Sequence, residues 1–198
     1  MTILITGFEP FGGDTVNPSA ELTRRFADET ATAILPVDFA ALQQQLPQLI
    51  TRHQPTHVVC LGLSGAATGL TFERVGLNLI DATIPDNSGV QPVDEPVVVG
   101  GPDAYFATLP VKAMRRATQR EGVPAGLSLT AGSYACNALL YLVLHLAATA
   151  PRDAGFRAGF VHVPRIEVLG LDAQEKGLRA ALTSLNVQEL HYADGQLQ

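Results

Sequence analysis

Hydrophobic and polar positions follow two different patterns along the chain. One pattern predicts strands and the other predicts helices, and the two alternate. Short apolar runs without alternation are typical of buried parallel strands, and they occur at residues 2–6, 33–37, 57–63 and 157–163. Segments with apolar residues three or four positions apart separate these runs and predict helices. We therefore expect a single α/β domain over residues 1–198, built as an open, twisted, mostly parallel or mixed sheet with helices on both faces.

Residues with capping side chains mark the predicted helix boundaries. Asn17, which is followed by a proline, predicts one helix start, and Asp38 predicts another. Pro47 lies inside the second helix and should kink it or end it early. Asp172 and Glu175 have the spacing of a capping box and predict that the last helix is capped by Asp172.

The middle of the chain differs from both ends. Residues 72–82 alternate apolar and polar side chains, which predicts one half-buried strand. Residues 84–103 contain four prolines and three glycines, too many for regular structure throughout. Because a loop of this length in a compact domain is often functional, we expect a lid or a subunit contact there.

Composition narrows the classes of protein that the chain can represent. With 13 basic residues and a net charge of −6, the chain lacks the excess of positive charge that binding to nucleic acid or to an anionic membrane surface requires. The longest apolar run, at 138–150, is shorter than a membrane span, and the amino-terminal residues have no signal-peptide pattern. Two cysteines are too few for a disulfide framework or a zinc site. We expect a cytoplasmic protein without a metal or cofactor.

The most informative stretch is 127–150, which predicts a strand, a turn of small residues and an apolar helix with Cys136 at its start. Unpaired N–H groups and the positive end of the helix dipole favour a thiolate there. The same N–H groups could hold an oxyanion, so Cys136 is a candidate nucleophile. A buried structural cysteine is an equal alternative on this pattern alone, because free cysteine is among the most buried residue types.

A cysteine nucleophile needs a base and a group that orients that base. His162 ends a buried strand, where an unpaired imidazole is costly, and it should lie at the sheet edge where Cys136 is expected. Glu73 is the candidate acid, because it stands in an otherwise apolar segment. Asp81 and Asp86 are alternatives, and the pattern alone does not decide among the three.

Five blocks of sequence carry a resemblance to a known family. The first, at 6–13, reads Thr-Gly-Phe-Glu-Pro-Phe-Gly-Gly and is joined by Asn-Pro-Ser at 17–19; the others are 72–79, 84–87, 131–137 and 159–164. In this order they resemble the pyroglutamyl peptidase type I family, also called pyrrolidone-carboxylate peptidases. The likeness runs from residue 2 to about residue 164.

This resemblance implies a cysteine peptidase that removes an amino-terminal pyroglutamate (5-oxoproline) from peptides through an acyl-enzyme. Cys136 would be the nucleophile, His162 the base and Glu73 the orienting acid. The resemblance also implies a homo-oligomer, such as a tetramer. In the implied substrate pocket Phe8 and Phe11 would sandwich the lactam ring, and Ile84, Tyr134 and Ala135 would line the remainder. Without the resemblance, the two phenylalanines would more often be ordinary packing residues.

Three positions depart from the family pattern and motivate an alternative. Family members usually carry an arginine where this chain has Thr83, a polar residue at Leu63 and an arginine near Ala67. A catalytically weak or inactive ligand-binding paralogue of the same fold is therefore the second interpretation. A third takes residues 7–13 as a nucleotide loop; it ranks last, because no lysine follows the glycines and Phe-Glu-Pro-Phe would obstruct a phosphate.

Overall fold

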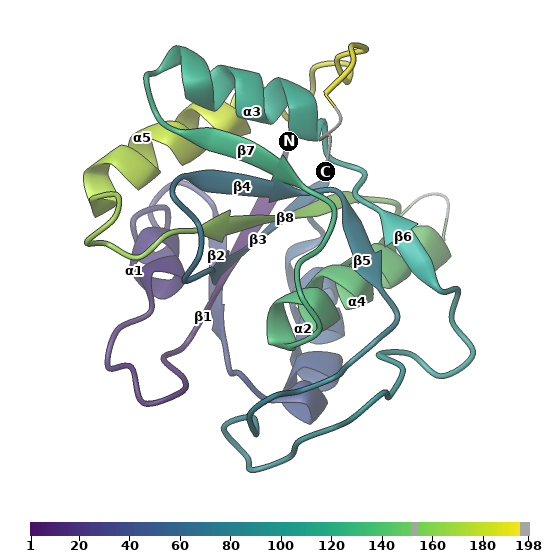
Figure 1. The fold of residues 1–198 in the computed structure, drawn as a ribbon. Helices are drawn as coiled ribbons and strands as arrows, with labels where there is room; N and C mark the ends of the chain where they lie inside the picture. Colours follow the sequence, from purple (N-terminus) through teal and green to yellow (C-terminus); the bar gives the residue numbers. More distant parts are fainter. Residues whose placement is uncertain (152–153, 195–198) are drawn as a thin grey trace.

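A computed structural model describes residues 1–151 and 154–194 of the chain (Figure 1). Strands and helices alternate along most of the sequence, as their hydrophobic pattern predicts. In chain order they are β1 (Ile3–Phe8), α1 (Pro18–Arg24), β2 (Ala31–Leu35), α2 (Phe39–His53), β3 (His57–Leu63), β4 (Leu70–Glu73), β5 (Val75–Leu77), β6 (Ala104–Phe106), α3 (Val111–Arg120), β7 (Ala125–Ser128), α4 (Ala135–Thr149), β8 (Arg157–Val163) and α5 (Leu171–Leu182).

Six of the strands form one mixed sheet in the order β2-β1-β3-β8-β4-β7. The first four are parallel to one another, β4 runs antiparallel to β8, and β7 is parallel to β4. Every residue of the central β3 is buried. The predicted mostly parallel or mixed sheet is confirmed. Its central strands are continuously apolar, because a strand that is covered on both faces of the sheet buries every side chain.

Helices cover both faces of this sheet, with α2 and α4 on one side and α1, α3 and α5 on the other (Figure 1). Successive strand residues point to opposite faces, so Leu4 belongs to the core under α2 and α4, whereas Ile5 belongs to the core under the other three helices. Among the described residues, no helix combines the length and the apolar character needed to cross a bilayer.

The predicted caps of the first two helices are present. Asn17 and Asp38 each accept a hydrogen bond from a backbone N–H in the first turn, at 3.0 and 2.8 Å. Of the two outcomes expected at Pro47, a kink or an early end, the early end is wrong, since α2 continues for six further residues to His53. Proline removes only one helical donor, and the buried face of the helix, with Leu42 and Leu46, keeps it in place.

The predicted capping box of the last helix is also wrong. Gly170 occupies the N-cap position of α5 without a side-chain cap. The carboxylates of Asp172 and Glu175 instead bind Arg25, which follows α1, at 2.5 and 2.6 Å. Both acids thus bind a guanidinium from a distant part of the chain, and Glu175 also binds Arg179 on its own helix at 2.8 Å.

The single strand predicted at 72–82 is divided in the structure. Its first part belongs to β4 in the large sheet, and its second part is β5, which pairs with the unpredicted β6 in a separate two-stranded sheet. The chain changes sheets at Arg74, whose N–H donates to the carbonyl oxygen of Ser128 at 2.9 Å. The alternation of apolar and polar side chains continues through Arg74, so the hydrophobic pattern does not indicate that the strand is divided there. Residues 84–103, all of them described, contain no helix or strand, as predicted.

Candidate active site

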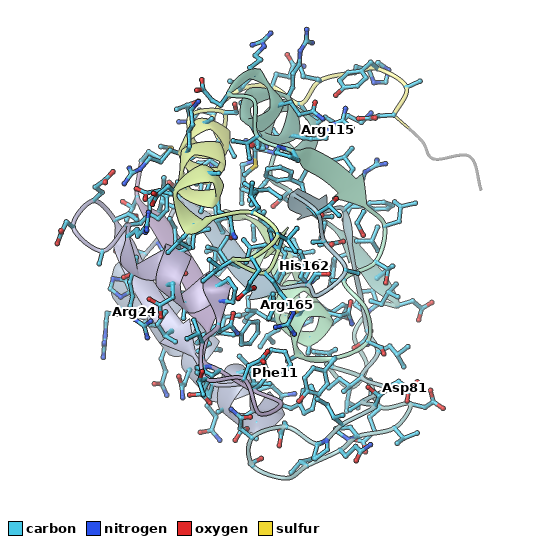
Figure 2. The ribbon with its side chains drawn as sticks, turned by 60° about the vertical axis from the view of Figure 1, so that its left-hand side comes forward. Phe11, Arg24, Asp81, Arg115, His162 and Arg165 are labelled. Atoms are coloured by element: carbon cyan, nitrogen blue, oxygen red, sulfur yellow. The ribbon has the colours of Figure 1, made fainter. Side chains whose placement is uncertain are left out.

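A cavity of about 430 Å³ opens where β1, β3 and β8 end and β4 begins. Phe11, from the loop after β1, and His162, from the end of β8, are both labelled in Figure 2 and are among the residues that line the cavity. The other lining residues come from the β3–β4 connection, from β4 and from the segment between β7 and α4; they are Leu63, Ser64, Ala66, Ala67, Thr71, Glu73, Ser128, Thr130, Ala131, Gly132, Tyr134 and Cys136.

His162 and Glu73 form a buried pair beneath this cavity. Antiparallel pairing of β4 with β8 sets Thr71 opposite His162 and places Glu73 diagonally across from it on the same face. His162 Nδ1 lies 2.7 Å from Glu73 Oε1, and the two residues are only 7% and 1% exposed. The ring of Phe160 packs edge-on against the imidazole, with centroids 4.8 Å apart. The imidazole is thus held on two sides.

The charge state of His162 depends on its neighbours. Burial lowers the pKa of His162, but the adjoining Cys136 thiolate and Glu73 carboxylate outweigh burial and raise the pKa to about 10. The imidazole is therefore protonated at neutral pH when it stands between two negative groups. Such a site favours the imidazolium form of His162.

Cys136 is the second residue of α4, close to the helix start predicted from the sequence. Tyr134 occupies the N-cap position and forms no side-chain cap, so the first N–H groups of α4 keep their donor capacity for another oxygen. The sulfur lies against β3 at Gly62, where an added Cβ atom would be 2.8 Å from Cys136 Sγ. A strand glycine and a helix start together fix the position of the thiol.

Comparisons with known proteins identify the family. The pyroglutamyl peptidase family profile matches residues 1–193. The chain is 48% identical over 177 residues to pyrrolidone-carboxylate peptidase of Thermococcus onnurineus, covering 87% of this chain and 88% of that protein. It is also 48% identical over 168 residues to the Streptomyces coelicolor protein of the same name, covering 82% and 77%. The crystal structure of Bacillus amyloliquefaciens pyroglutamyl peptidase I superposes with a TM-score of 0.88 at 37% identity, covering 93% of this chain and 96% of that one.

The chain belongs to the pyroglutamyl peptidase family. The members of this family are cysteine peptidases that remove an amino-terminal pyroglutamate, so the chain is a hydrolase by membership.

Aromatic side chains form one wall of the cavity in this family member. The rings of Phe11 and Tyr134 lie 6.1 Å apart, and Phe39 packs edge-on against Tyr134 at 5.5 Å. The hydroxyl of Tyr134 donates to the carbonyl oxygen of Pro85 at 3.0 Å, which fixes its ring. The loop that carries Phe11 turns through positive φ values of 62° and 87° at residues 12 and 13, a conformation for which glycine is suited.

The other three expected pocket residues have different surroundings. Phe8 ends β1 and is 2% exposed, and Ala135 is buried at the start of α4. Ile84 is exposed and close to the Phe11 loop, with its Cδ1 3.9 Å from a Cβ position on Gly12. None of the three is among the lining residues given above, so their contact with a bound ring stays a prediction.

Positions that depart from the family pattern fall into two groups. Leu63 and Ala67 line the cavity on the β3–β4 connection, so the departures there change the chemistry of the cavity wall. Thr83 is exposed and does not line the cavity.

The alternative acids have other partners. Asp86 Oδ2 accepts the N–H of Phe39 at 3.0 Å, at the beginning of α2, and Asp81 is exposed. Glu73 alone of the three candidate acids contacts His162 in the described residues. Within the same described ranges, no group of three or more His, Cys, Asp or Glu side chains is arranged to hold a metal ion.

Several residues of the site were missed by the sequence reasoning. Thr71 and Gly62 flank His162 on the two neighbouring strands, and Ser128 and Thr130 line the cavity after β7. Gly62, Thr71 and Ser128 join the site through strand register, which a single sequence does not reveal directly. Asn137 could have been found from the sequence, because it is a polar residue in the first turn of an apolar helix. Its side chain exchanges hydrogen bonds of 2.9 Å with the backbone of residues 77 and 79 and so ties the start of α4 to the small sheet.

Proposed function

We propose that this protein removes amino-terminal pyroglutamate from peptides with Cys136 as nucleophile, His162 as general acid and base, and Glu73 as the residue that orients His162. The observation that carries the proposal is the buried His162–Glu73 pair, 2.7 Å apart, beside a helix-start cysteine in a cavity with an aromatic wall. The reaction is the one that defines the family.

In the first step, the Cys136 thiolate attacks the carbonyl carbon that joins pyroglutamate to the next residue. The oxygen of that carbonyl gains negative charge as the tetrahedral intermediate forms. Backbone N–H groups in the first turn of α4, which has no side-chain cap, point toward this developing charge and stabilise it.

In the second step, His162 gives its proton to the leaving amine, and the C–N bond breaks to leave a thioester on Cys136. The raised pKa of His162 keeps this proton available at neutral pH. After proton transfer the neutral imidazole takes a proton from water, whose oxygen attacks the thioester and releases pyroglutamate. Glu73, bound at Nδ1, leaves the opposite ring nitrogen to face the reacting atoms.

The pyroglutamyl ring is uncharged and flat, and it lacks the ammonium group of an ordinary amino terminus. Phe11, Tyr134 and, by family resemblance, Phe8 would hold it between apolar surfaces, with Ile84 and Ala135 completing the pocket. An amino-terminal ammonium in this aromatic pocket would lose its water without gaining a counter-ion, which favours the lactam over proline.

We further propose, from the sequence and the family resemblance, that residues 1–198 form one peptidase domain acting in the cytoplasm as a homo-oligomer. A tetramer is the expected assembly, with residues 84–103 as the candidate subunit contact. Pyroglutamyl peptides are the expected partners, and neither nucleic acid nor a membrane is expected.

A ligand-binding paralogue without efficient turnover is the second candidate function. Leu63 and Ala67 favour it, because both line the cavity at positions where family members carry other residue types. Under this alternative, pyroglutamyl peptides would bind without being cleaved.

The test is the release of aminomethylcoumarin from its pyroglutamyl amide under reducing conditions, with the prolyl amide as the matched control. We expect turnover of the pyroglutamyl amide alone, and its loss after treatment with iodoacetamide. A folded protein that binds pyroglutamyl peptide by calorimetry but releases no coumarin would contradict the proposal and support the paralogue.

A further inference from the structure

The cavity continues past the catalytic residues, away from its aromatic wall. Along the sheet, Phe11 follows β1, whereas Thr71 lies on β4 and Ser128 ends β7. His162, on β8, stands between these two sides. The connection from β3 to β4 passes the end of β8, because those two strands flank β8 in the sheet.

The direction of the substrate follows from the proton that His162 must deliver. If the ring lies against Phe11 and Tyr134, the scissile nitrogen has to lie next to His162. The residue after pyroglutamate then leaves the cavity over β8, toward β4 and β7. It meets the part of the cavity that begins with Leu63 at the end of β3 and continues through Ala66, Ala67, Thr71, Ser128 and Thr130, which we call the leaving-group subsite.

The leaving-group subsite is uncharged. Its side chains are three apolar groups and three hydroxyls, and the only acids or bases that line the whole cavity in the described residues are Cys136, His162, Glu73 and the phenol of Tyr134. Two of the hydroxyls already have partners, because Ser128 Oγ donates to the carbonyl of Thr130 at 2.9 Å and Thr130 Oγ1 accepts the N–H of Gly132 at 3.1 Å.

A charged side chain close to the β3–β4 connection has a partner of opposite charge. Arg165 Nε lies 3.9 Å from the Cβ position of Gly65, at the outer side of the connection, and Figure 2 labels Arg165 on the same side of the molecule as His162. Its guanidinium binds Asp14 at 3.3 Å. This pair is half exposed and presents no net charge to a peptide in the cavity.

We propose that the leaving-group subsite binds the side chain of the residue after pyroglutamate and selects uncharged, apolar side chains at that position. A charged side chain would lose water against this wall without finding a partner. An apolar side chain would cover Leu63, Ala66 and Ala67 and gain free energy from the buried surface. The proposal rests on the proposed function and specifies the substrates of the same site.

The experiment compares kcat/KM for pyroglutamyl peptides that differ only in the second residue, with leucine, phenylalanine, aspartate or lysine there. We expect the two apolar substrates to exceed the two charged ones by about tenfold or more. Equal kcat/KM values across the four peptides would overturn the proposal.

Charge substitutions at Ala67 make the test specific to this wall. Ala67→Lys should raise the ratio of kcat/KM for the aspartate peptide to that for the leucine peptide by about tenfold, and Ala67→Glu should do the same for the lysine peptide. Ala104→Lys, on the exposed β6, is the matched control and should leave the ratios unchanged. The proposal is overturned if the Ala67 and Ala104 variants give the same ratios.

Pyroglutamyl aminomethylcoumarin separates this proposal from the proposed function. Folded wild-type protein that cleaves neither the coumarin amide nor any of the four peptides contradicts the proposed function, and the subsite with it. Cleavage of the coumarin amide without discrimination among the four peptides contradicts the leaving-group subsite alone.

Discussion

Gly62 shows how closely β3 approaches the sulfur of Cys136. It pairs with His162 in the register of β3 and β8. A Cβ atom at this position would lie 2.8 Å from Cys136 Sγ and 2.6 Å from the ring of Phe160. Both distances are shorter than ordinary van der Waals contact, so a methyl group there must displace the sulfur or the ring that supports His162.

Gly62→Ala should therefore lower kcat more than it changes KM. We expect a fall in kcat of about tenfold to a hundredfold, because a displacement of an ångström at reacting atoms costs about that much. Alkylation of Cys136 by iodoacetamide should slow in parallel. Gly126→Ala on β7, where an added Cβ meets no atom within 4 Å, is the control. Equal kcat values for the two variants would show that Gly62 does not position the thiol.

The raised pKa of His162 predicts the alkaline side of the pH profile. Below about pH 10 the imidazole of His162 is protonated and can donate its proton to the leaving amine. As the pH rises through that value, the proton is lost and kcat/KM should fall. Glu73→Gln removes one of the two negative groups that raise this pKa, so its alkaline limb should shift to lower pH. The measurement is kcat/KM against pH for both proteins. An alkaline limb that Glu73→Gln leaves unmoved would contradict the assigned role of Glu73.

At the level of single residues, the three side chains proposed to react could be named from the sequence, because each is a polar group in an apolar setting. Their partners on neighbouring strands could not. Gly62 and Thr71 become part of the site only through the register of β3 and β4 with β8, which depends on contacts across the sheet.

Among the elements, the long irregular segment at 84–103 is joined to the first turn of α2 by the side chain of Asp86. Asp86 is 6% exposed and accepts N–H groups from Phe39 at 3.0 Å, Ser88 at 3.0 Å and Val90 at 2.9 Å. Burial raises the pKa of Asp86, but these hydrogen bonds outweigh burial and lower the pKa below its usual value. The carboxylate joins the segment that carries Ile84 to the first turn of α2.

Asp86→Asn should lower the free energy of unfolding at pH 7 by about 1.5–3 kcal/mol, the range for hydrogen bonds to a charged group. Because the folded-state pKa is lowered, the advantage of aspartate is present above the unfolded pKa of about 3.8 and is lost as the pH falls through the lower folded value. Urea unfolding at pH 7 and pH 3 measures it, with the exposed Asp81→Asn as control. A difference between wild type and Asp86→Asn that does not shrink at pH 3 would contradict this assignment.

Elements buried on both faces were predicted best. The bounds of β3 and β8 agree with the apolar runs at 57–63 and 157–163, because continuous burial leaves a continuous apolar signal. Predictions failed where a tertiary contact overrides a local rule. Arg25 takes the acids of the expected capping box, and the chain changes sheets at Arg74 inside an unbroken alternation.

For the whole molecule, alternating strands and helices were enough to place the site at the edge where the parallel strands end. The reversed direction of β4 could not be predicted, because an alternating pattern indicates a half-buried strand without fixing its direction in the sheet. That reversal sets Thr71 opposite His162 and Glu73 diagonally across from it. The pairing of His162 with Glu73 therefore depends on the strand directions of the whole sheet.

The central claim is that Cys136, of the two cysteines in the chain, carries the reaction. Cys60 is fully buried on β3, where burial raises the pKa of its thiol to about 12. It therefore stays a thiol at neutral pH and is the matched control for Cys136. The most direct measurement is hydrolysis of pyroglutamyl aminomethylcoumarin by Cys136→Ala and by Cys60→Ala, with the fold of each variant verified by circular dichroism. We predict that Cys136→Ala loses turnover by at least about a thousandfold, whereas Cys60→Ala keeps it within about tenfold of wild type. Turnover by Cys136→Ala at the wild-type rate would contradict the account.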